Sequence, residues 1–504
     1  MDSLTHFDKL NSADQSLVQK CVGAGGAFLH ASSNGSDEKS LGKLQPSFVS
    51  AFAQDNFLVW IPDGCPSGKS TTVASSRIGK KLDEHSDWFD TLRTLGVQLS
   101  DTNHFLITSE STTTDRFVRR ISELFQIPLV VFKPFPKRVT EAWCAAQVEN
   151  SGSENPGSEK PDFKTNSKLT YDAWYKPIAL ESAKSAADSN QLHNINDLLI
   201  GIAQSAFLLS VRNSGNVFKA AKHRLENKTN EASTTKLLIN KSLTPAKVEK
   251  SLLEKGAAAW LLLGENCDSE TKTENPQPSS VLPTKPSQHS QPNFTHQFEP
   301  SSSPEAKILS IDEIKTDQFL LHWTRRRNGP WPDQSSDQFL DDLIFQSSRS
   351  NHNQIASLCR ILATRTILGS SDITRDRRQV VCFSNVGVDQ LPQKRTFRSH
   401  LSRWDFELYG IAIDKELLIE LGAKPVIYGS DSVWDELTDA DRPWFQVEKS
   451  QSGTVDWQSE KEWRILGDLK LDQIPLDQAF LFVPREADAA VAAKLSHWPI
   501  VILK

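Results

Sequence analysis

Cysteine is scarce and scattered in this sequence. The six cysteines among 504 residues stand far apart and form no C-x-x-C pair. This spacing excludes a zinc-binding framework and a disulfide scaffold, and it is typical of a protein of a reducing cytosol. No apolar run approaches the roughly 18 residues that cross a bilayer, and the polar start MDSLTHFDKLNSADQS does not have the pattern of a signal peptide. A net charge of −6 excludes a uniformly basic nucleic-acid binder. We therefore expect a cytoplasmic protein that does not contact a membrane.

Composition divides the chain into two halves. Residues 265–306 are rich in Ser, Pro, Thr, Gln and Asn and have almost no apolar side chains. Such a segment cannot bury enough surface to offset the entropy of ordering its backbone. We expect an α/β, Rossmann-like domain at 1–264, a disordered linker at 265–306 and an α+β domain at 307–504. A Ser/Gly/Pro-rich stretch at 148–168 predicts a disordered loop inside the first domain.

Two segments of the first half share one pattern. HFLITSESTTTDRFVRRISELFQIPLVVF (104–132) predicts a strand, a polar turn, an amphipathic helix and a second strand, and residues 205–240 repeat the plan. KGAAAWLLLG (255–264) predicts the last strand of this half. Alternating strands and helices favour a parallel sheet. A polar turn that opens a helix places backbone N–H groups at the strand's carboxyl end, where doubly wound sheets bind phosphorylated ligands.

The turn of the second segment contains Ser214, Gly215 and Asn216. It resembles the turn of the Rossmann-like nucleotide-binding folds of the LOG/SLOG class, and the resemblance implies a small nucleotide-type ligand. Thr112 and Thr113 occupy the corresponding turn of the first segment. These residues are either ligands of a phosphate or ordinary helix caps, and the sequence leaves both readings open. The cofactor is not identified by the sequence, and a nucleotide or NAD is the candidate.

A third stretch partly matches a phosphate-binding loop. Gly68, Lys69 and Ser70 fit the end of the pattern G-x-x-x-x-G-K-[ST], but Asp63 occupies the first glycine position. An acidic residue at that position would repel phosphate. A broken phosphate loop and a Ser/Gly turn that caps the next helix are the two interpretations.

Four pieces organise the second half: VVCFS (380–384), HLSRWDFELYGIAID (400–414), GAKPVIYG (422–429) and DWQSEKEWRIL (456–466). In order and spacing they resemble the AbiGi-type family of bacterial abortive-infection proteins and the uncharacterised families related to it. The resemblance covers about the last 200 residues. It implies a role in phage defence or toxin–antitoxin control, and it implies no particular reaction.

Several side chains of the second half could carry chemistry. The order His322, Tyr409, then Glu460 or Glu462 is similar to the His, Tyr, Glu order of ADP-ribosyltransferases. That resemblance implies NAD as substrate, with the histidine on the ribose, the tyrosine on the nicotinamide and the glutamate stabilising the oxocarbenium charge. Glu460, Glu462 and Arg464 would share one face of a strand. The alternative is structural: a Glu–Arg pair across two strands that fixes their register. The sequence does not decide whether the protein is an enzyme.

Charge is uneven in the second half. Residues 325–403 contain 13 Lys/Arg against 7 Asp/Glu, whereas residues 404–480 contain 7 against 17. The basic segment opens with Arg325, which could grip a phosphate. It predicts either a surface for nucleic acid, as in a DNA-binding regulator, or two lobes that neutralise each other inside one fold.

Overall fold

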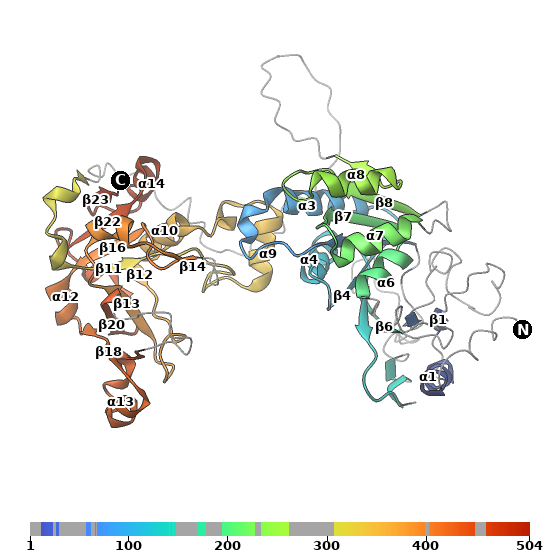
Figure 1. Cartoon of the computed structure of the whole chain (residues 1–504), viewed down its shortest axis with the longest axis horizontal. Helices are drawn as coiled ribbons and strands as arrows, with labels where there is room; N and C mark the ends of the chain where they lie inside the picture. The colour runs from blue at the N-terminus through green and yellow to red at the C-terminus, as the bar shows by residue number, and fades with distance from the viewer. Residues whose placement is uncertain are drawn as a thin grey trace, which may run out of the picture. The chain divides into compact units, whose positions relative to one another are not determined.

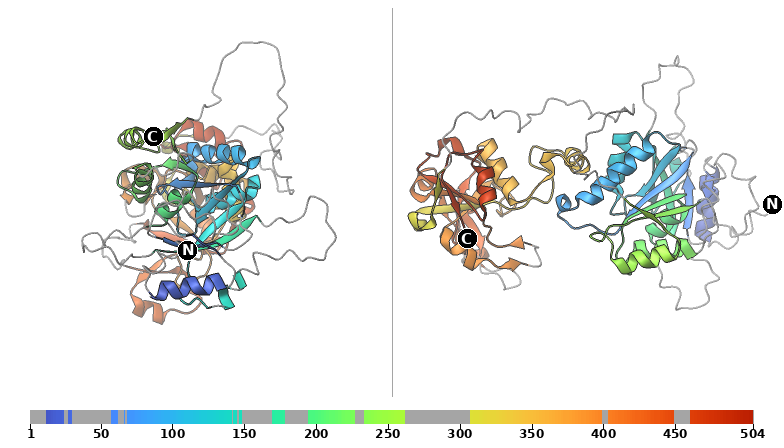
Figure 2. Two further views of the ribbon diagram at one scale, coloured as in Figure 1. Left: turned by 90° about the vertical axis from the view of Figure 1, so that its right-hand side faces the viewer. Right: turned by 90° about the horizontal axis from the view of Figure 1, so that it is seen from above.

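The computed structural model describes residues 12–23, 27–29, 57–61, 66, 68–140, 142–144, 146–147, 169–177, 194–226, 233–261, 307–398, 403–448 and 460–503. The predicted loop at 148–168 and the predicted linker at 265–306 lie outside these residues. The chain forms two compact units: unit 1 is Met1–Thr271 with Pro330–Ser350, and unit 2 is Lys272–Gly329 with Asn351–Lys504. Figures 1 and 2 show both units. Within the described residues no helix combines the length and the apolar character needed to cross a membrane.

Unit 1 is built on a sheet with the order β1-β2-β6-β5-β4-β3-β7-β8-β9. Strands β3 to β9 run parallel to one another, whereas β2, at one edge, pairs antiparallel with both β6 and β1. The strands are β1 (Ala27–Leu29), β2 (Phe57–Ile61), β3 (Lys69–Ser75), β4 (His104–Ser109), β5 (Leu129–Pro134), β6 (Thr170–Pro177), β7 (Ser205–Ser210), β8 (Thr234–Leu238) and β9 (Ala258–Trp260). The run β5-β4-β3-β7-β8-β9 is the doubly wound Rossmann order, which reverses direction between β3 and β7. The predicted α/β class and the predicted last strand are confirmed.

Helices cover both faces of this sheet (Figure 1). On one face α3 (Ser86–Ser100) and α4 (Asp115–Phe125) share a core with Leu106 and Val131. On the other, α6 (Ile195–Ile202), α7 (Asn216–Glu226) and α8 (Ala246–Glu254) pack against the alternate strand residues. Two-sided burial explains the apolar runs within β4, β5 and β7. A short helix, α1 (Ser12–Gly23), lies near β1.

The glycine-lysine-serine triplet does not form a phosphate loop. Lys69 and Ser70 begin β3, and Gly68 adopts a φ of +136° where a Cβ would stand 2.6 Å from the Asn103 carbonyl oxygen. A phosphate loop must lie between a strand and a helix, whereas this triplet leads into the central strand. The phosphate-loop interpretation is therefore wrong, and so is the expected helix cap.

One helix of unit 1 comes from the second half of the sequence. The helix α9 (Ser336–Ile344) belongs to the segment Pro330–Ser350, and its apolar stripe is buried in the same core as α3 and α4. We predicted a single domain at 307–504, and the segment Pro330–Ser350 departs from that prediction because it belongs to unit 1. Its capping box at Ser335 and Gln338 fixes where the helix starts.

Unit 2 contains an eight-stranded mixed sheet in the order β10-β23-β22-β16-β11-β13-β20-β17, as expected for an α+β domain. From β22 to β17 all neighbours are antiparallel. The strands are β10 (Ile308–Leu309), β11 (Phe319–Trp323), β13 (Val380–Ser384), β16 (Gly410–Asp414), β17 (Lys424–Pro425), β20 (Glu462–Leu466), β22 (Ala479–Val483) and β23 (Ile500–Ile502). Three two-stranded pairs flank it: β12 (Thr366–Ile367) with β21 (Leu469–Lys470), β14 (Phe397–Arg398) with β15 (Arg403–Trp404), and β18 (Ile427–Gly429) with β19 (Phe445–Val447).

The two faces of this sheet carry separate cores. Leu320, Ile411 and Phe383 point to the face covered by α10 (Gln354–Thr364), α12 (Lys415–Glu420) and α14 (Glu486–Ala492). Leu321 and Ala412 point to the opposite face, which packs with the short helix α11 (Leu391–Lys394) and the residues around it. Because side chains alternate along a strand, this division decides which predicted site residues can meet. The remaining short helix is α13 (Asp431–Glu436).

Candidate functional site

The carboxyl edge of the unit 1 sheet gathers three polar strand ends. The strands β3, β4 and β7 end on Ser75, Ser109 and Ser210, which are all buried. These strands are adjacent and parallel, so the loops that follow them lie at one edge. The order of the sheet reverses between β3 and β7, and doubly wound sheets bind their ligands at such a reversal.

The loops after β3 and β7 are bonded to each other. The backbone N–H of Ser76 donates to the Ser210 carbonyl at 2.6 Å, and the N–H of Arg212 donates to the Ser76 hydroxyl at 2.9 Å. The Arg212 guanidinium donates in turn to the Arg77 carbonyl at 2.5 Å. Both arginine side chains are exposed. Two cations therefore stand at the edge of the sheet, and neither was among the residues predicted from sequence.

The predicted ligands Thr112 and Thr113 follow β4. The Thr112 hydroxyl donates to the Ser109 carbonyl at 2.8 Å, and the Thr113 hydroxyl donates to the Ser75 carbonyl at 3.0 Å. Thr114 makes the same kind of bond to Val73 at 3.0 Å. The three threonine hydroxyl groups thus hydrogen-bond this turn to β3 and β4. Contact with an anion would come from the backbone N–H groups of the turn and of the first turn of α4.

The predicted turn Ser214, Gly215 and Asn216 leads into α7 at the same edge. Ser214 has a left-handed φ of +58°, and the Gly215 carbonyl accepts the N–H of Lys219 at 3.0 Å, so the helix begins here. A Cβ on Gly215 would stand 3.9 Å from the Ser76 hydroxyl oxygen. The structure thus brings both predicted turns to the end of β3, Thr113 through Ser75 and Gly215 through Ser76.

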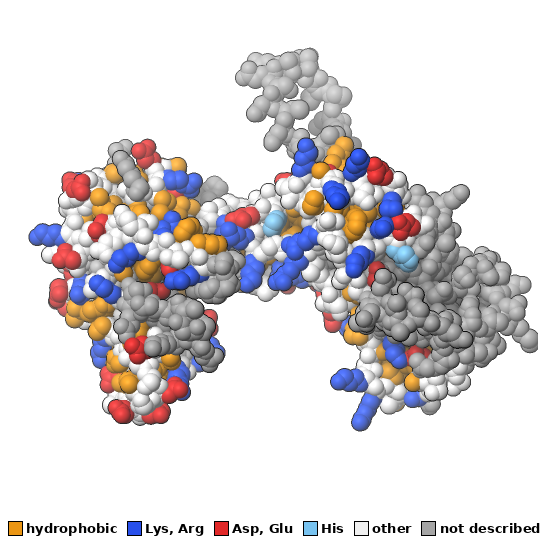
Figure 3. Space-filling model, in the orientation of Figure 1, with side chains coloured by type: hydrophobic (Ala, Val, Ile, Leu, Met, Phe, Trp, Pro, Cys, Tyr) orange, Lys and Arg blue, Asp and Glu red, His pale blue; other side chains and the backbone are white. Residues whose placement is uncertain are grey.

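The surroundings of this edge are rich in basic side chains. Lys80, Lys81 and Lys241 are exposed on the loops after β3 and β8, and Lys81 is ion-paired with Glu84. Lys and Arg side chains are also spread over the face of unit 1 that carries α7 and α8 (Figure 3). The acidic residue at the start of α4, Asp115, is ion-paired with Arg119 at 2.8 Å. The helix N-termini and these cations together favour an anionic ligand.

In unit 2, the side chains of the predicted residues His322 and Tyr409 are hydrogen-bonded within the fold. The Nδ1–H of His322 donates to the Cys382 carbonyl at 2.9 Å, and its ring meets that of Phe383 edge-on at 5.8 Å. Burial lowers the pKa of His322 and holds the ring neutral. The Tyr409 hydroxyl donates to the Asp488 carboxylate at 3.0 Å. Both side chains lie on the face covered by α10, α12 and α14.

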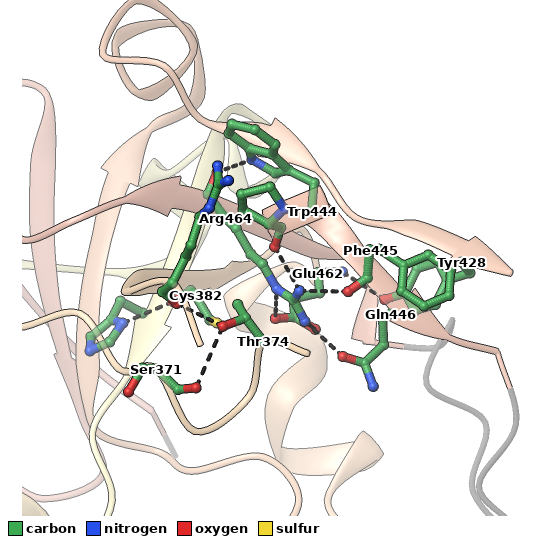
Figure 4. A network of polar contacts seen from close by, with 12 residues as sticks. Ser371, Thr374, Cys382, Tyr428, Trp444, Phe445, Gln446, Glu462 and Arg464 are labelled. Atoms are coloured by element: carbon green, nitrogen blue, oxygen red, sulfur yellow. Dashed lines mark hydrogen bonds and ion pairs between the residues drawn. The ribbon is translucent and has the colours of Figure 1, made fainter. Parts of the chain in front are cut away.

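Glu462 and Arg464 lie on the opposite face of the sheet. Arg464 is only 1% exposed and donates to Glu462 at 2.8 Å, to Gln446 at 2.8 Å and to the carbonyls of Pro443 and Phe445 at 3.0 and 2.9 Å (Figure 4). The ion pair expected from the sequence is present, but it joins two residues of one strand rather than two strands. The bonds to Pro443, Phe445 and Gln446 join β20 to β19 and to the short turn before it.

The expected convergence of His322, Tyr409 and Glu462 is therefore wrong. The register pairs Leu321 with Ser384 and Ser384 with Glu462, which puts Glu462 on the Leu321 face and His322 on the other. Glu460 contributes its carbonyl to the Ser384 hydroxyl at 2.6 Å. The spacing of the three residues along the sequence could not reveal this, because the face depends on strand register. The geometry of an ADP-ribosyltransferase site is not formed by these side chains.

Four arginines of the basic segment 325–403 form ion pairs with acidic residues of the following segment. Ion pairs join Arg365 to Asp472, Arg375 to Asp431, Arg395 to Glu407 and Arg398 to Asp405. Arg325 donates to the Asp405 carbonyl at 2.8 Å and stands over the Trp323 ring. The uneven charge of the sequence is thus balanced in part by ion pairs within unit 2, which agrees with one of the two interpretations.

Comparison with known proteins adds little to this geometry. No family model matches the chain. No curated protein matches it. Among solved structures, it is similar to DNA processing protein A from Streptococcus pneumoniae, with 8% identity, a TM-score of 0.28, and coverage of 49% of this chain and 74% of that one. It is also similar to DNA processing protein A from Helicobacter pylori, with 10% identity, a TM-score of 0.24, and coverage of 42% and 86%. Identity and TM-score are both low, so the Rossmann-like assignment rests on the strand order of unit 1, and the AbiGi resemblance stays a prediction.

Proposed function

We propose that unit 1 binds a small nucleotide-type ligand by its phosphate groups at the carboxyl edge of β3, β4 and β7. The observation that carries this proposal is the meeting of both predicted turns at the end of β3, where the strand order reverses. Folds of this order bind phosphorylated ligands at that place.

The chemistry of the edge suits phosphate. The first turns of α4 and α7 carry the positive end of the helix dipole. Arg77 and Arg212 add two guanidinium groups that can bind phosphate oxygens in a bidentate manner. NAD, with its pyrophosphate, remains a candidate for this site in unit 1.

The decisive variant is Gly215→Asp. The added carboxylate has room, since the nearest atoms to a Cβ there are 3.6 Å or more away, and an acidic residue at a helix N-terminus does not disfavour folding. It would repel a phosphate. We expect ATP, GTP or NAD to raise the melting temperature of the wild-type chain and not that of the variant, while the unliganded melting temperatures agree.

A charge-matched control is Gln98→Glu, an exposed position near the carboxyl end of α3 and hence at the other edge of the sheet. Ligand binding by this variant should equal that of the wild type. Equal binding by Gly215→Asp would place the ligand elsewhere and refute the proposal. Absence of a shift with all three probes would refute the choice of nucleotide.

In the wider context, we propose a bacterial defence protein in which unit 1 senses a nucleotide and unit 2 is the AbiGi-like effector or regulator. The order of the pieces from 380 to 466 supports this context. Cells that produce the wild-type chain should form fewer phage plaques than cells that produce Gly215→Asp at the same protein level. Equal plaque counts across a panel of phages would contradict the defence role.

A second candidate function is binding of nucleic acid by unit 2. The observation that favours it is the hairpin β14–β15, where Phe397 is 51% exposed and meets Trp404 edge-on at 5.4 Å, with Arg395 stacked over Trp404 at 4.3 Å. Exposed aromatic rings beside arginines stack on the bases of single strands.

The test is anisotropy of a labelled single-stranded oligonucleotide at several salt concentrations. Phe397→Ala should weaken binding by about 1–3 kcal/mol, whereas Leu476→Ala, a substitution of another exposed apolar residue of unit 2, should not. Affinity should also fall with rising salt. Binding that is identical in the two variants would exclude the hairpin as the contact.

A further inference from the structure

The segment that carries α9 belongs to unit 1, although the chain before it and after it belongs to unit 2. We call this segment the excursion. Residues before Gly329 and after Asn351 belong to unit 2, whereas Pro330–Ser350 belongs to unit 1. The two ends of the excursion are joined within unit 2, because the N–H of Arg327 donates to the His352 carbonyl at 3.0 Å. The chain therefore leaves unit 2 and re-enters it at neighbouring residues.

The contact of α9 with unit 1 is both apolar and ionic. Phe339, Leu340, Leu343 and Ile344 are between 0% and 6% exposed in the core shared with α3 and α4. Asp341 receives two bonds from one guanidinium, from Arg120 Nε at 2.6 Å and from Arg120 Nη2 at 2.7 Å. This bidentate pair fixes the orientation of α9 along α4.

Both helices that hold α9 also contact the proposed ligand edge. The indole N–H of Trp88, on α3, donates to the Ser75 hydroxyl at the end of β3, at 3.1 Å. The turn that opens α4 is tied to the same serine through Thr113. Arg120 therefore lies on the helix whose first turn forms part of the proposed site, and Trp88 reaches that site from the other helix.

We propose that α9 positions the α4 turn for the ligand, with Asp341 as a positioning residue, so that docking of α9 and occupancy of the site are coupled. The proposal rests on the proposed function of unit 1. Coupling of this kind is reciprocal. A ligand that orders the α4 turn strengthens the docking of α9, and undocking of α9 lowers the affinity for the ligand.

The experiment uses the full chain with Asp341→Asn, which preserves shape and removes the charge, and with the double variant Arg120→Asp with Asp341→Arg, which restores an ion pair in reverse. Amide exchange without ligand is measured first. We expect Asp341→Asn to speed exchange in residues 336–344 and also in residues 110–117, and we expect the double variant to restore much of the protection in both. Faster exchange confined to 336–344 would overturn the positioning role.

ATP binding is then measured on the same three proteins. We expect Asp341→Asn to weaken it by between about 5- and 150-fold, the usual range of coupling between two sites, with partial recovery in the double variant. Unchanged affinity alongside faster exchange of α9 would overturn the coupling and leave the ligand site standing. If the wild type binds none of ATP, GTP and NAD, the proposed function fails, and the exchange of residues 110–117 still decides the positioning role.

Discussion

Removal of one buried leucine should detach α9 from unit 1. Leu343 is 1% exposed in the core that α9 shares with α3 and α4. Truncation of such a leucine to alanine costs about 2–5 kcal/mol, which combines the lost transfer free energy with the cavity that remains. Since about 1.4 kcal/mol corresponds to a factor of ten, Leu343→Ala should weaken docking of α9 by roughly 30-fold to a few thousandfold.

Hydrogen exchange of the full chain, followed by mass spectrometry, measures this effect. Amides of residues 336–344 should lose protection by that factor, whereas the strands β4 and β5 should keep theirs. The matched control is Leu261→Ala, since Leu261 also belongs to unit 1 and is 62% exposed, so its loss should change stability by less than about 0.5 kcal/mol. If β4 and β5 lose as much protection as α9, the helix is an inseparable part of the unit 1 core and our reasoning is refuted.

Three further predictions concern unit 2. Arg464→Met should destabilise unit 2 by about 3–5 kcal/mol in urea unfolding, because it leaves Glu462 as an uncompensated, largely buried charge; a loss below 1 kcal/mol would contradict the structural role. Burial, with Asp488 nearby, raises the pKa of Cys359 to about 11, so its alkylation at pH 8 should be about a hundredfold slower than that of an ordinary thiol, and rates that agree would count against this environment. The pKa of His322 is lowered by burial, so the unfolded chain takes up the proton more readily, and stability should fall as pH drops below about 6.5. In His322→Asn this part of the pH dependence should disappear from unfolding curves measured between pH 5 and 8.

The strand–turn–helix–strand segments of unit 1 could be predicted because their periodicity is strong. The elements β4, α4 and β5, and then β7, α7 and β8, lie where residues 104–132 and 205–240 predicted them. The central strand β3 was missed, because Ser70, Thr71 and Thr72 are polar by composition although they are fully buried in the sheet. The Gly-Lys-Ser sequence at its start resembled a phosphate-binding loop. Only the pairing with β4 and β7 identifies β3 as a strand.

Candidate site residues could be predicted where a local turn determines their position. They could not be predicted where their position depends on how distant strands pair. Gly215 and Thr113 were found from the strand that precedes each turn, and the structure brings them to one edge. Arg212 was missed although it stands two residues before Ser214, because its bond to the β3 loop depends on a strand that was not recognised. His322 and Glu462 were grouped by their order along the chain, and strand register separates them.

The packing of α9 on unit 1 could not be predicted from composition. Its stripe of Phe339, Leu340, Leu343 and Ile344 is a usual amphipathic pattern, which shows that the helix buries one face but not against which partner. The partner is determined by the apolar surface of α3 and α4 and by Arg120, more than 200 residues earlier in the chain.

The binding of a nucleotide at the carboxyl edge of unit 1 is tested most directly by hydrogen exchange of the full chain with and without saturating ATP. We expect added protection in residues 112–118 and 214–219, which form the turns that precede α4 and α7 and the starts of these helices, and no added protection at the opposite edge around residues 100–103. Protection that appears only in unit 2, or at that opposite edge, would contradict it.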